Sequence, residues 1–284
     1  MPVVWSPSPA YVERANVTRL MRAHGIDGYE ELLARSTADI AWFWDAVVRD
    51  LGLDFMEPYE RVLDTTHGVP WTTWFVGGRT NLAERCVDTW AARTPDAPAV
   101  VWESEDEHVR TLTYRELRAL TDRVAHGLRA LGVRERDTVG IFLPMAPETV
   151  AAVMACAKVG AVFVPIFSGF GPDAVAARLA DAGARVLITA DGSLRKGRAV
   201  PMLETARRAA ELAGCVERIV VWPRLDPDAL AAGPSEVPWA GLLGTSTRRS
   251  TRSRWTASIR CSWATRAGRP AGRRAPCTCT PGSW

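Results

Sequence analysis

Two short segments contain the residue types that proteins use to bind phosphate groups. Residues 167–174 read FSGFGPDA, and their glycines would let backbone N–H groups and the start of a helix approach an anion closely. Residues 191–198 read DGSLRKGR, which places three cations within four residues beside two glycines. Because an arginine can bind two phosphate oxygens at once, this second segment is suited to holding a phosphate. Both segments are therefore candidate ligand-binding loops.

Each segment also has competing interpretations. The first could be a tight turn between a strand and a helix, with no ligand at all. From Gly169 it also matches the dinucleotide-binding pattern G-x-G-x-x-A, and Asp191 follows at about the distance expected for a ribose-binding acid. The second could be a solvated basic turn, which is the usual explanation of an isolated charge cluster. The residues of the two segments alone leave these alternatives open.

The elements around these segments predict a parallel α/β sheet. From Trp74 onward, short β-branched runs alternate with alanine-rich amphipathic stretches. Strands are predicted at residues 99–103, 110–112, 138–143, 162–166, 186–189 and 218–221. Helices are predicted at residues 113–131, 147–158, 172–182 and 202–213. Both candidate loops directly follow strands, and such sheets bind ligands beyond the carboxyl ends of their strands, so we expect the loops to converge on one ligand.

The regions on either side of this pattern differ from it. Residues 1 to about 75 are predicted to be helical and rich in packed aromatic side chains, and residues 36–39 can cap a helix that buries one apolar face. That face contains Trp42, Phe43, Val47 and Leu51. After Trp222, prolines at positions 223, 227, 234 and 238 predict a linker.

The last forty-one residues, 244–284, have a different composition from the rest of the chain. They contain nine arginines, no lysine and no acidic residue, whereas residues 1–243 carry 26 basic and 32 acidic side chains. The tail has no apolar period of a helix or a strand, so it is predicted to be disordered. A basic arm that binds nucleic acid is one interpretation, but no aromatic stacking pattern or basic helical face favours nucleic acid as a partner.

Composition argues against several protein classes. The three cysteines before the tail are far apart in apolar runs, which indicates reduced thiols and a cytoplasmic protein. The four histidines pair with no cysteine at metal-ligand spacing, so no metal site is expected. The amino terminus has no secretory signal pattern. The longest apolar run, residues 149–167, contains Lys158 and Gly160 and predicts a helix, a turn and a strand rather than a membrane span.

Five strings, taken in order and spacing, resemble one enzyme family. They are WFVGG at 74–78, LTYREL at 112–117, LPMAPE at 143–148, FSG at 167–169 and ITADG at 188–192. Over about residues 30 to 225 the chain resembles acetyl-CoA synthetase and its close acyl-CoA synthetase relatives, which are adenylate-forming (AMP-forming) ligases. The resemblance implies an α/β fold class: a helical amino-terminal cap, then the first parallel-sheet α/β subdomain of such a ligase.

The resemblance also implies an activity and its cofactors. Such ligases use ATP and magnesium to activate a carboxylate, by default acetate or another short-chain acid, and then transfer the acyl group to coenzyme A. By position, the residues that would line the coenzyme A site are Phe167, Ser168 and Gly169. The residues that would hold its phosphorylated adenosine end are Arg195, Lys196, Gly197 and Arg198. The family more often has Gly at position 168 and Ser at position 171. The resemblance assigns no catalytic residue in this chain. It makes the dinucleotide interpretation of the first segment the weaker one.

One family element is missing from the chain as written, namely the Ser/Thr/Gly-rich loop ending in Lys-Gly that wraps the ATP phosphates. The genetic code offers an explanation. When the last base of each codon is joined to the first two of the next, the codons of residues 264–275 permit YTSGTTGRPKG, with Arg274 as AGG. The preceding codons permit LDSEHPLL and the following ones AVHVHAGFL. We therefore hypothesise a frameshift, with the reading frame lost between about Trp239 and Arg254.

These observations predict three parts and a ranked set of functions. The parts are an amino-terminal cap at 1–75, an incomplete first α/β subdomain at 76–240 and an out-of-frame tail at 241–284. By descent the chain is predicted to be an acyl-CoA synthetase. The sequence as it stands is predicted to be a truncated, inactive fragment of that enzyme. The alternatives are a non-catalytic fragment that binds coenzyme A weakly and an NAD-type Rossmann protein. We expect a cytoplasmic location and no membrane partner.

Overall fold

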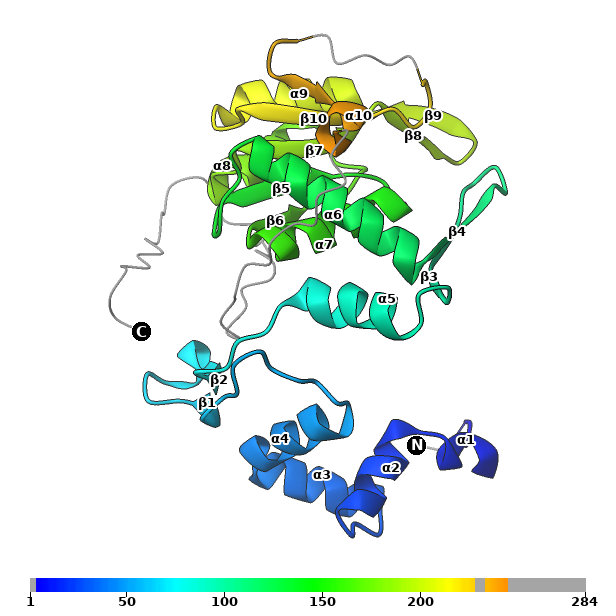
Figure 1. Cartoon of the computed structure of the whole chain (residues 1–284), viewed down its shortest axis with the longest axis vertical. Helices are drawn as coiled ribbons and strands as arrows, with labels where there is room; N and C mark the ends of the chain where they lie inside the picture. Colours follow the sequence, from blue (N-terminus) through cyan, green and yellow to red (C-terminus); the bar gives the residue numbers. More distant parts are fainter. Residues whose placement is uncertain (1–3, 228–232, 245–284) are drawn as a thin grey trace. The chain divides into compact units, whose positions relative to one another are not determined.

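The structure, a computed structural model, describes residues 4–227 and 233–244 of the chain (Figure 1). The described residues form two compact units. The first unit contains residues 4–136, 145–161 and 240–244, and the second contains residues 137–144, 162–227 and 233–239. The predicted out-of-frame tail lies outside the described residues except for its first few positions.

The first unit begins with a helical segment and a small β-hairpin. The helices are α1 (Pro9–Glu13), α2 (Asn16–Ala23), α3 (Tyr29–Ala38) and α4 (Ile40–Asp50). The hairpin consists of β1 (Arg61–Asp64) and β2 (Thr73–Val76), with the short helix η1 (Val69–Trp71) between them. Asp39 caps α4, since its carboxylate accepts the N–H of Trp42 at 2.8 Å. The predicted cap and helix are therefore confirmed.

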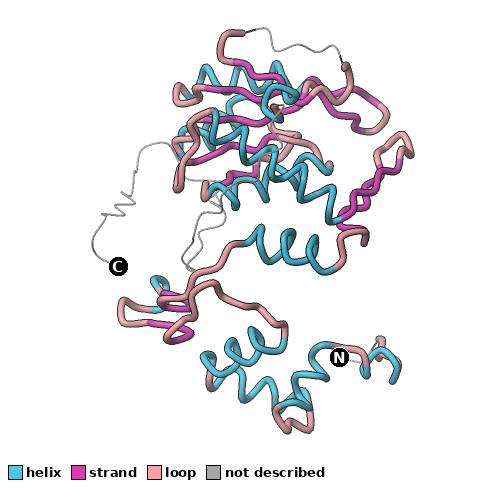
Figure 2. Tube along the Cα trace, viewed as in Figure 1, coloured by secondary structure: helices cyan, strands magenta, loops and turns pink. Residues whose placement is uncertain are grey.

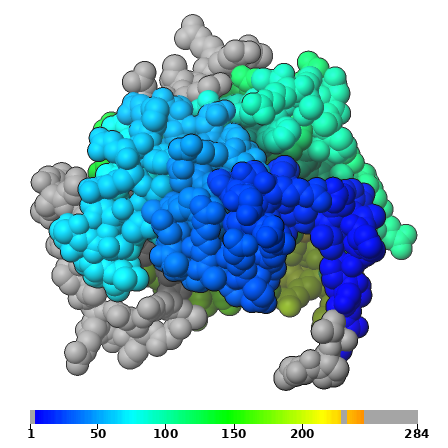
Figure 3. Space-filling model, turned by 90° about the horizontal axis from the view of Figure 1, so that it is seen from below, coloured from blue at the N-terminus to red at the C-terminus, as the bar shows by residue number. Residues whose placement is uncertain are grey.

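The predicted apolar face of α4 is largely but not wholly packed. Trp42, Phe43 and Val47 pack against a core formed by Leu20, Ile26, Leu32 and Ala46. Leu51 lies at the carboxyl end of the helix and is exposed, so its predicted burial is wrong. Other aromatic side chains of this segment, drawn in blue to cyan in Figure 3, also remain exposed, including Trp5, Tyr11, Tyr29, Trp44 and Trp71. The tryptophans of this segment are thus not all core residues.

The rest of the first unit is a helical layer with a second hairpin. Its elements are η2 (Glu84–Asp88, a π-helical turn), α5 (Thr89–Arg93), β3 (Pro98–Glu103), β4 (Val109–Thr113), α6 (Tyr114–Ala130) and α7 (Pro147–Val159). The predicted capping box is present, because Thr113 and Glu116 each accept the backbone N–H of the other. Helices α6 and α7 pack against each other, and Val87, Leu117 and Ala151 form a core between η2 and these helices.

The strands β3 and β4 occur where they were predicted but not in the parallel sheet. They pair with each other as an antiparallel hairpin. The physical reason is visible in the sequence: five residues, 104–108, join the two strands. A parallel pairing would need a crossover of a dozen residues or more, whereas a short loop suffices for an antiparallel pair.

The second unit is built on a five-stranded sheet, whose strands are the arrows of Figure 1 and are magenta in Figure 2. Every pairing in this sheet is parallel. The strands are β5 (Thr138–Phe142), β6 (Val162–Pro165), β7 (Val186–Ala190), β10 (Arg218–Trp222) and β11 (Glu236–Pro238), in the order β11-β10-β7-β5-β6. The helices α8 (Pro172–Ala182) and α9 (Met202–Ala213) pack against each other. The elements predicted between residues 138 and 222 are confirmed to within one residue at each end, except for the hairpin described below. Every residue of the central strand β7 is buried, as expected of a strand in a parallel sheet.

The predicted linker after Trp222 is partly wrong. Residues 236–238 form β11, which extends the sheet beside β10, and residues 239–243 form the short helix α10 (Trp239–Leu243). Proline is compatible with an edge strand, where one row of N–H groups faces away from the ladder, so the proline count was misleading. The carboxylate of Glu236 is buried and binds Arg207 at 2.6 Å, which attaches this strand to α9.

Helix α10 is docked within the first unit. A Cβ added to Gly127 of α6 would lie 2.1 Å from the carbonyl oxygen of Leu242. Leu242 is buried, and the guanidinium group of Arg123 lies 3.4 Å from the carbonyls of Leu243 and Gly244. The close approach at Gly127 shows that residues up to the end of α10 fit a complementary surface. None of the helices in the described part of the chain combines the length and the hydropathy that crossing a membrane requires.

Candidate functional site

The first candidate loop, residues 166–171, connects β6 to α8. Phe167 is 56% exposed, and its ring meets that of Phe170 edge to face at a centroid distance of 5.5 Å. The guanidinium group of Arg178, a residue of α8, stacks over the Phe170 ring at 4.3 Å from the ring centroid. Ser168 is half-buried and Gly169 is exposed. The loop therefore presents an aromatic ring and a glycine backbone to solvent at the carboxyl end of β6.

The second candidate loop is a β-hairpin. Strands β8 (Gly192–Arg195) and β9 (Arg198–Pro201) pair antiparallel and are joined by two residues. Lys196 and Gly197 have positive φ angles of 52° and 70°, the backbone conformation typical of the two-residue turns that join the strands of a β-hairpin. Arg195 lies directly opposite Arg198 in the ladder, so the two side chains leave the same face of the hairpin.

The hairpin brings the two predicted loops together. A Cβ added to Gly169 would lie 2.6 Å from Nη1 of Arg195, and the guanidinium group of Arg195 lies 5.6 Å from the ring centroid of Phe167. Strand β5 separates β6 from β7, so the loops start about 10 Å apart at the usual strand spacing. A four-residue strand is about 13 Å long, which lets the hairpin cross that gap. The two loops are thus in contact with each other, and their convergence on one ligand stays a prediction.

The electrostatic character of this surface favours an anion. Within the residues that the structure describes, no carboxylate lies within ion-pair distance of Arg195, Lys196 or Arg198, and all three side chains are exposed. Three cations on one short hairpin, without internal compensation, attract phosphate groups. Because Gly169 has no side chain, the guanidinium group of Arg195 and the ring of Phe167 lie directly against its backbone. Among the residues that the structure describes, there is no cluster of three or more His, Cys, Asp or Glu side chains that could hold a metal ion.

Asp191 has a different environment from the one that a ribose-binding acid needs. Its carboxylate accepts hydrogen bonds from the backbone N–H groups of Gly192 at 2.8 Å, Arg224 at 2.7 Å and Asp226 at 2.8 Å. These bonds use both oxygens of the carboxylate within the protein. The geometry therefore opposes the dinucleotide interpretation, in which this acid would bind a ribose hydroxyl.

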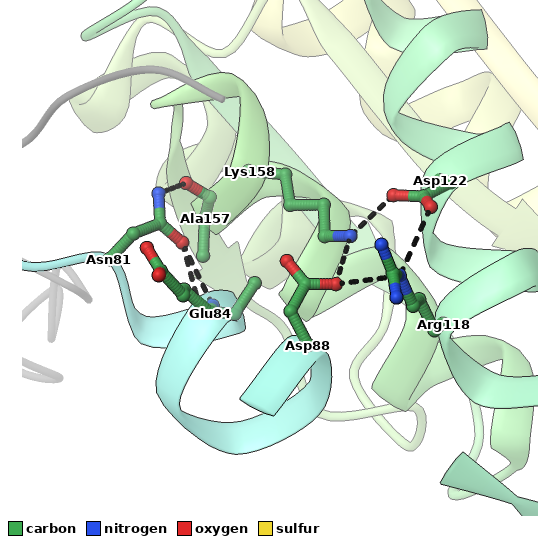
Figure 4. A network of polar contacts seen from close by, with 8 residues as sticks. Asn81, Glu84, Asp88, Arg118, Asp122, Ala157 and Lys158 are labelled. Carbon is green, nitrogen blue, oxygen red and sulfur yellow. Dashed lines mark hydrogen bonds and ion pairs between the residues drawn. The ribbon is translucent and has the colours of Figure 1, made fainter. Parts of the chain in front are cut away.

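A second polar cluster, in the first unit, is structural (Figure 4). The ammonium group of Lys158 is buried between Asp88, at 2.8 Å, and Asp122. Arg118 binds the same two carboxylates, at 3.3 Å and 3.8 Å. Two cations and two anions from η2, α6 and α7 are thus paired with one another in this cluster. The sequence pattern around Lys158 gives no signal of this, because its two partners are 36 and 70 residues away.

Two family models match consecutive parts of the chain. The model of the AMP-binding enzyme family matches residues 87–252, and the model of the acetyl-coenzyme A synthetase N-terminus matches residues 29–86. Together they include the hairpin β8–β9 and the loop before α8.

Individual proteins show the same similarity. The acetyl-coenzyme A synthetase of Thiobacillus denitrificans is 38% identical over 223 residues, which is 78% of this chain and 33% of the relative. That of Methanothrix soehngenii is 33% identical over 245 residues, or 84% of this chain and 36% of the relative. The solved structure of acetoacetyl-CoA synthetase from Streptomyces lividans superposes with a TM-score of 0.80 at 29% identity, covering 89% of this chain and 39% of that protein. The chain spans about a third of the length of the curated relatives it matches.

Proposed function

Because the chain belongs to the AMP-binding enzyme family, we propose that it derives from an acyl-CoA synthetase and that its second unit supplies part of the coenzyme A site. The complete enzyme would activate acetate or another short-chain carboxylate with ATP and magnesium to an acyl-adenylate. Coenzyme A, when bound, supplies the thiol that accepts the acyl group. We place this enzyme in the cytoplasm and keep the division into residues 1–75, 76–240 and 241–284 as part of the proposal.

The observation that carries the proposal is the contact between the two loops. Gly169 and Phe167 contact Arg195, so one surface offers a glycine backbone, an aromatic ring and cations that pair with no carboxylate among the described residues. Coenzyme A has an adenine ring and phosphate groups, which such a surface matches. The residues that would hold it are Phe167, Ser168, Gly169, Arg195, Lys196, Gly197 and Arg198.

Titration calorimetry with three ligands tests this proposal against its alternatives. We expect the chain to bind coenzyme A weakly, because a single basic surface encloses little of the ligand. ATP should bind more weakly still, since the ATP phosphate loop is absent from the chain as written. Binding of NAD at micromolar strength would instead support the dinucleotide alternative and overturn the proposal.

Replacing Arg198 by alanine should weaken coenzyme A binding by about tenfold or more, since a charge-assisted hydrogen bond to phosphate contributes about 1.5–3 kcal/mol. The same calorimetric titration measures this change. Arg208→Ala is the matched control, because Arg208 is an exposed arginine of α9 that pairs with Glu211 at 3.0 Å away from the hairpin. Equal affinities for the Arg198 and Arg208 variants would contradict the assignment of the phosphate group to the hairpin.

The proposal includes the loss of the reading frame before the phosphate loop, so that the chain as written does not catalyse adenylation. Three observations support it. The tail has nine arginines and no acidic residue after a body with an acidic excess. Its shifted codons permit YTSGTTGRPKG. The family match reaches residue 252, which falls inside the interval in which the frame change is proposed.

A further inference from the structure

Asp191 lies where β7 ends and the basic hairpin begins, and its backbone closes the base of the hairpin. Its carbonyl oxygen accepts the N–H groups of Met202 at 3.0 Å and Leu203 at 3.2 Å, the two residues that follow β9. The chain that enters the hairpin and the chain that leaves it are therefore held by one residue. A two-stranded hairpin is at best marginally stable alone, so its orientation depends on such anchors.

The side chain of Asp191 fastens the same base to the loop after β10. Besides the N–H groups of Gly192, Arg224 and Asp226, the carboxylate accepts that of Leu225 at 3.1 Å. Hydrogen bonds to an ionised carboxylate are about twice as strong as neutral ones. The packing agrees, because a Cβ added to Gly192 would lie 2.7 Å from Cδ1 of Leu225. The loop after β10 thus lies directly against the root of the hairpin.

We propose that Asp191 is the positioning residue of the coenzyme A surface. Its carbonyl oxygen binds the chain that leaves β9, and its carboxylate binds the loop after β10. Asp191 thus holds the cations of the hairpin beside the loop at residues 167–169. Asp191 itself needs no contact with the ligand. This inference rests on the proposed function, because it assigns a role in ligand binding to a residue whose own contacts are all within the protein.

Asp191→Asn is the direct test. The amide keeps the shape of the side chain, but it removes the charge and points an N–H2 donor at backbone N–H donors. We expect the amides of residues 193–200 to exchange hydrogen at least tenfold faster, while those of β5 and β7 keep their rates. We also expect the Kd for coenzyme A, measured by calorimetry, to rise at least fivefold. Asp181→Asn is the control, since Asp181 is exposed and its carboxylate makes no hydrogen bond or ion pair to any described residue of the chain.

Each outcome decides one claim. Unchanged exchange of the hairpin in Asp191→Asn would overturn the positioning role, and so would faster exchange with an unchanged Kd for coenzyme A. Absence of coenzyme A binding by the unaltered chain would overturn the proposed function, while the exchange data would still show whether Asp191 anchors the hairpin. If Asp191→Asn does not fold, Asp191→Glu is measured instead. This variant keeps the charge but moves the carboxylate one bond further from the backbone, and we expect the amides of residues 193–200 to exchange faster than in the unaltered chain. Exchange equal to that of the unaltered chain would contradict the proposal.

Discussion

Lys158→Met is expected to lower the free energy of unfolding by about 3–5 kcal/mol, the usual cost of removing one partner from a buried ion pair. Lys158 is only 4% exposed and binds Asp88 at 2.8 Å, with Asp122 as its second partner (Figure 4). Methionine fills a similar volume, so little packing is lost. The two carboxylates would keep Arg118 but lose the ammonium group of Lys158, and Asp88 is itself buried.

Urea denaturation followed by circular dichroism measures this loss. The chain offers a matched control, because it has only one other lysine, Lys196, which is exposed at the tip of the hairpin. Lys196→Met should change the free energy of unfolding by no more than about 0.5 kcal/mol, as is usual for surface substitutions. Equal stability of the two variants would contradict a stabilising role of the buried cluster.

The chain as written should release no pyrophosphate from ATP in the presence of acetate, magnesium and coenzyme A. The reason is chemical: in-line attack on ATP needs backbone N–H groups and a cation around the phosphates, and the written sequence contains no loop of that kind. A coupled pyrophosphate assay measures the rate, with the acetyl-coenzyme A synthetase of Thiobacillus denitrificans as the positive control. Pyrophosphate release that depends on acetate and scales with the concentration of this chain would refute the prediction.

Local signals in the sequence were sufficient for most of the fold. Helix α6 follows from a capping box at Thr113 and a stop at Gly132, and α8 follows from Pro172 at its first position. These signals act within a few residues, so sequence reasoning can find them. Strand β11 was missed because it is short and lies at an edge, where its partner β10, rather than its own residues, makes it a strand.

The candidate site was predictable in its composition but not in its construction. The common edge of a parallel sheet predicts that the two loops start on the same side of the sheet. Their contact depends on the hairpin, which the sequence does not predict, since Lys196 adopts a positive φ angle that non-glycine residues seldom adopt and that its ladder imposes. The anchoring by Asp191 depends on N–H groups 33 to 35 residues away, and the partners of Lys158 are similarly remote. Interactions over such distances leave no periodic pattern in the sequence.

Sequencing the gene across codons 235–284 tests the central claim most directly, that a synthetase body is followed by an out-of-frame tail. We form shifted triplets by joining the last base of each codon, from Ala264 onward, to the first two bases of the next codon. We expect these triplets to encode YTSGTTGRPKG, which requires the codons GCT for Ala264 and AGG for Arg274. The shifted frame should remain open on both sides of this run. A shifted frame that encodes other residues or stops within the run would contradict the claim and leave the basic tail as a genuine part of the protein.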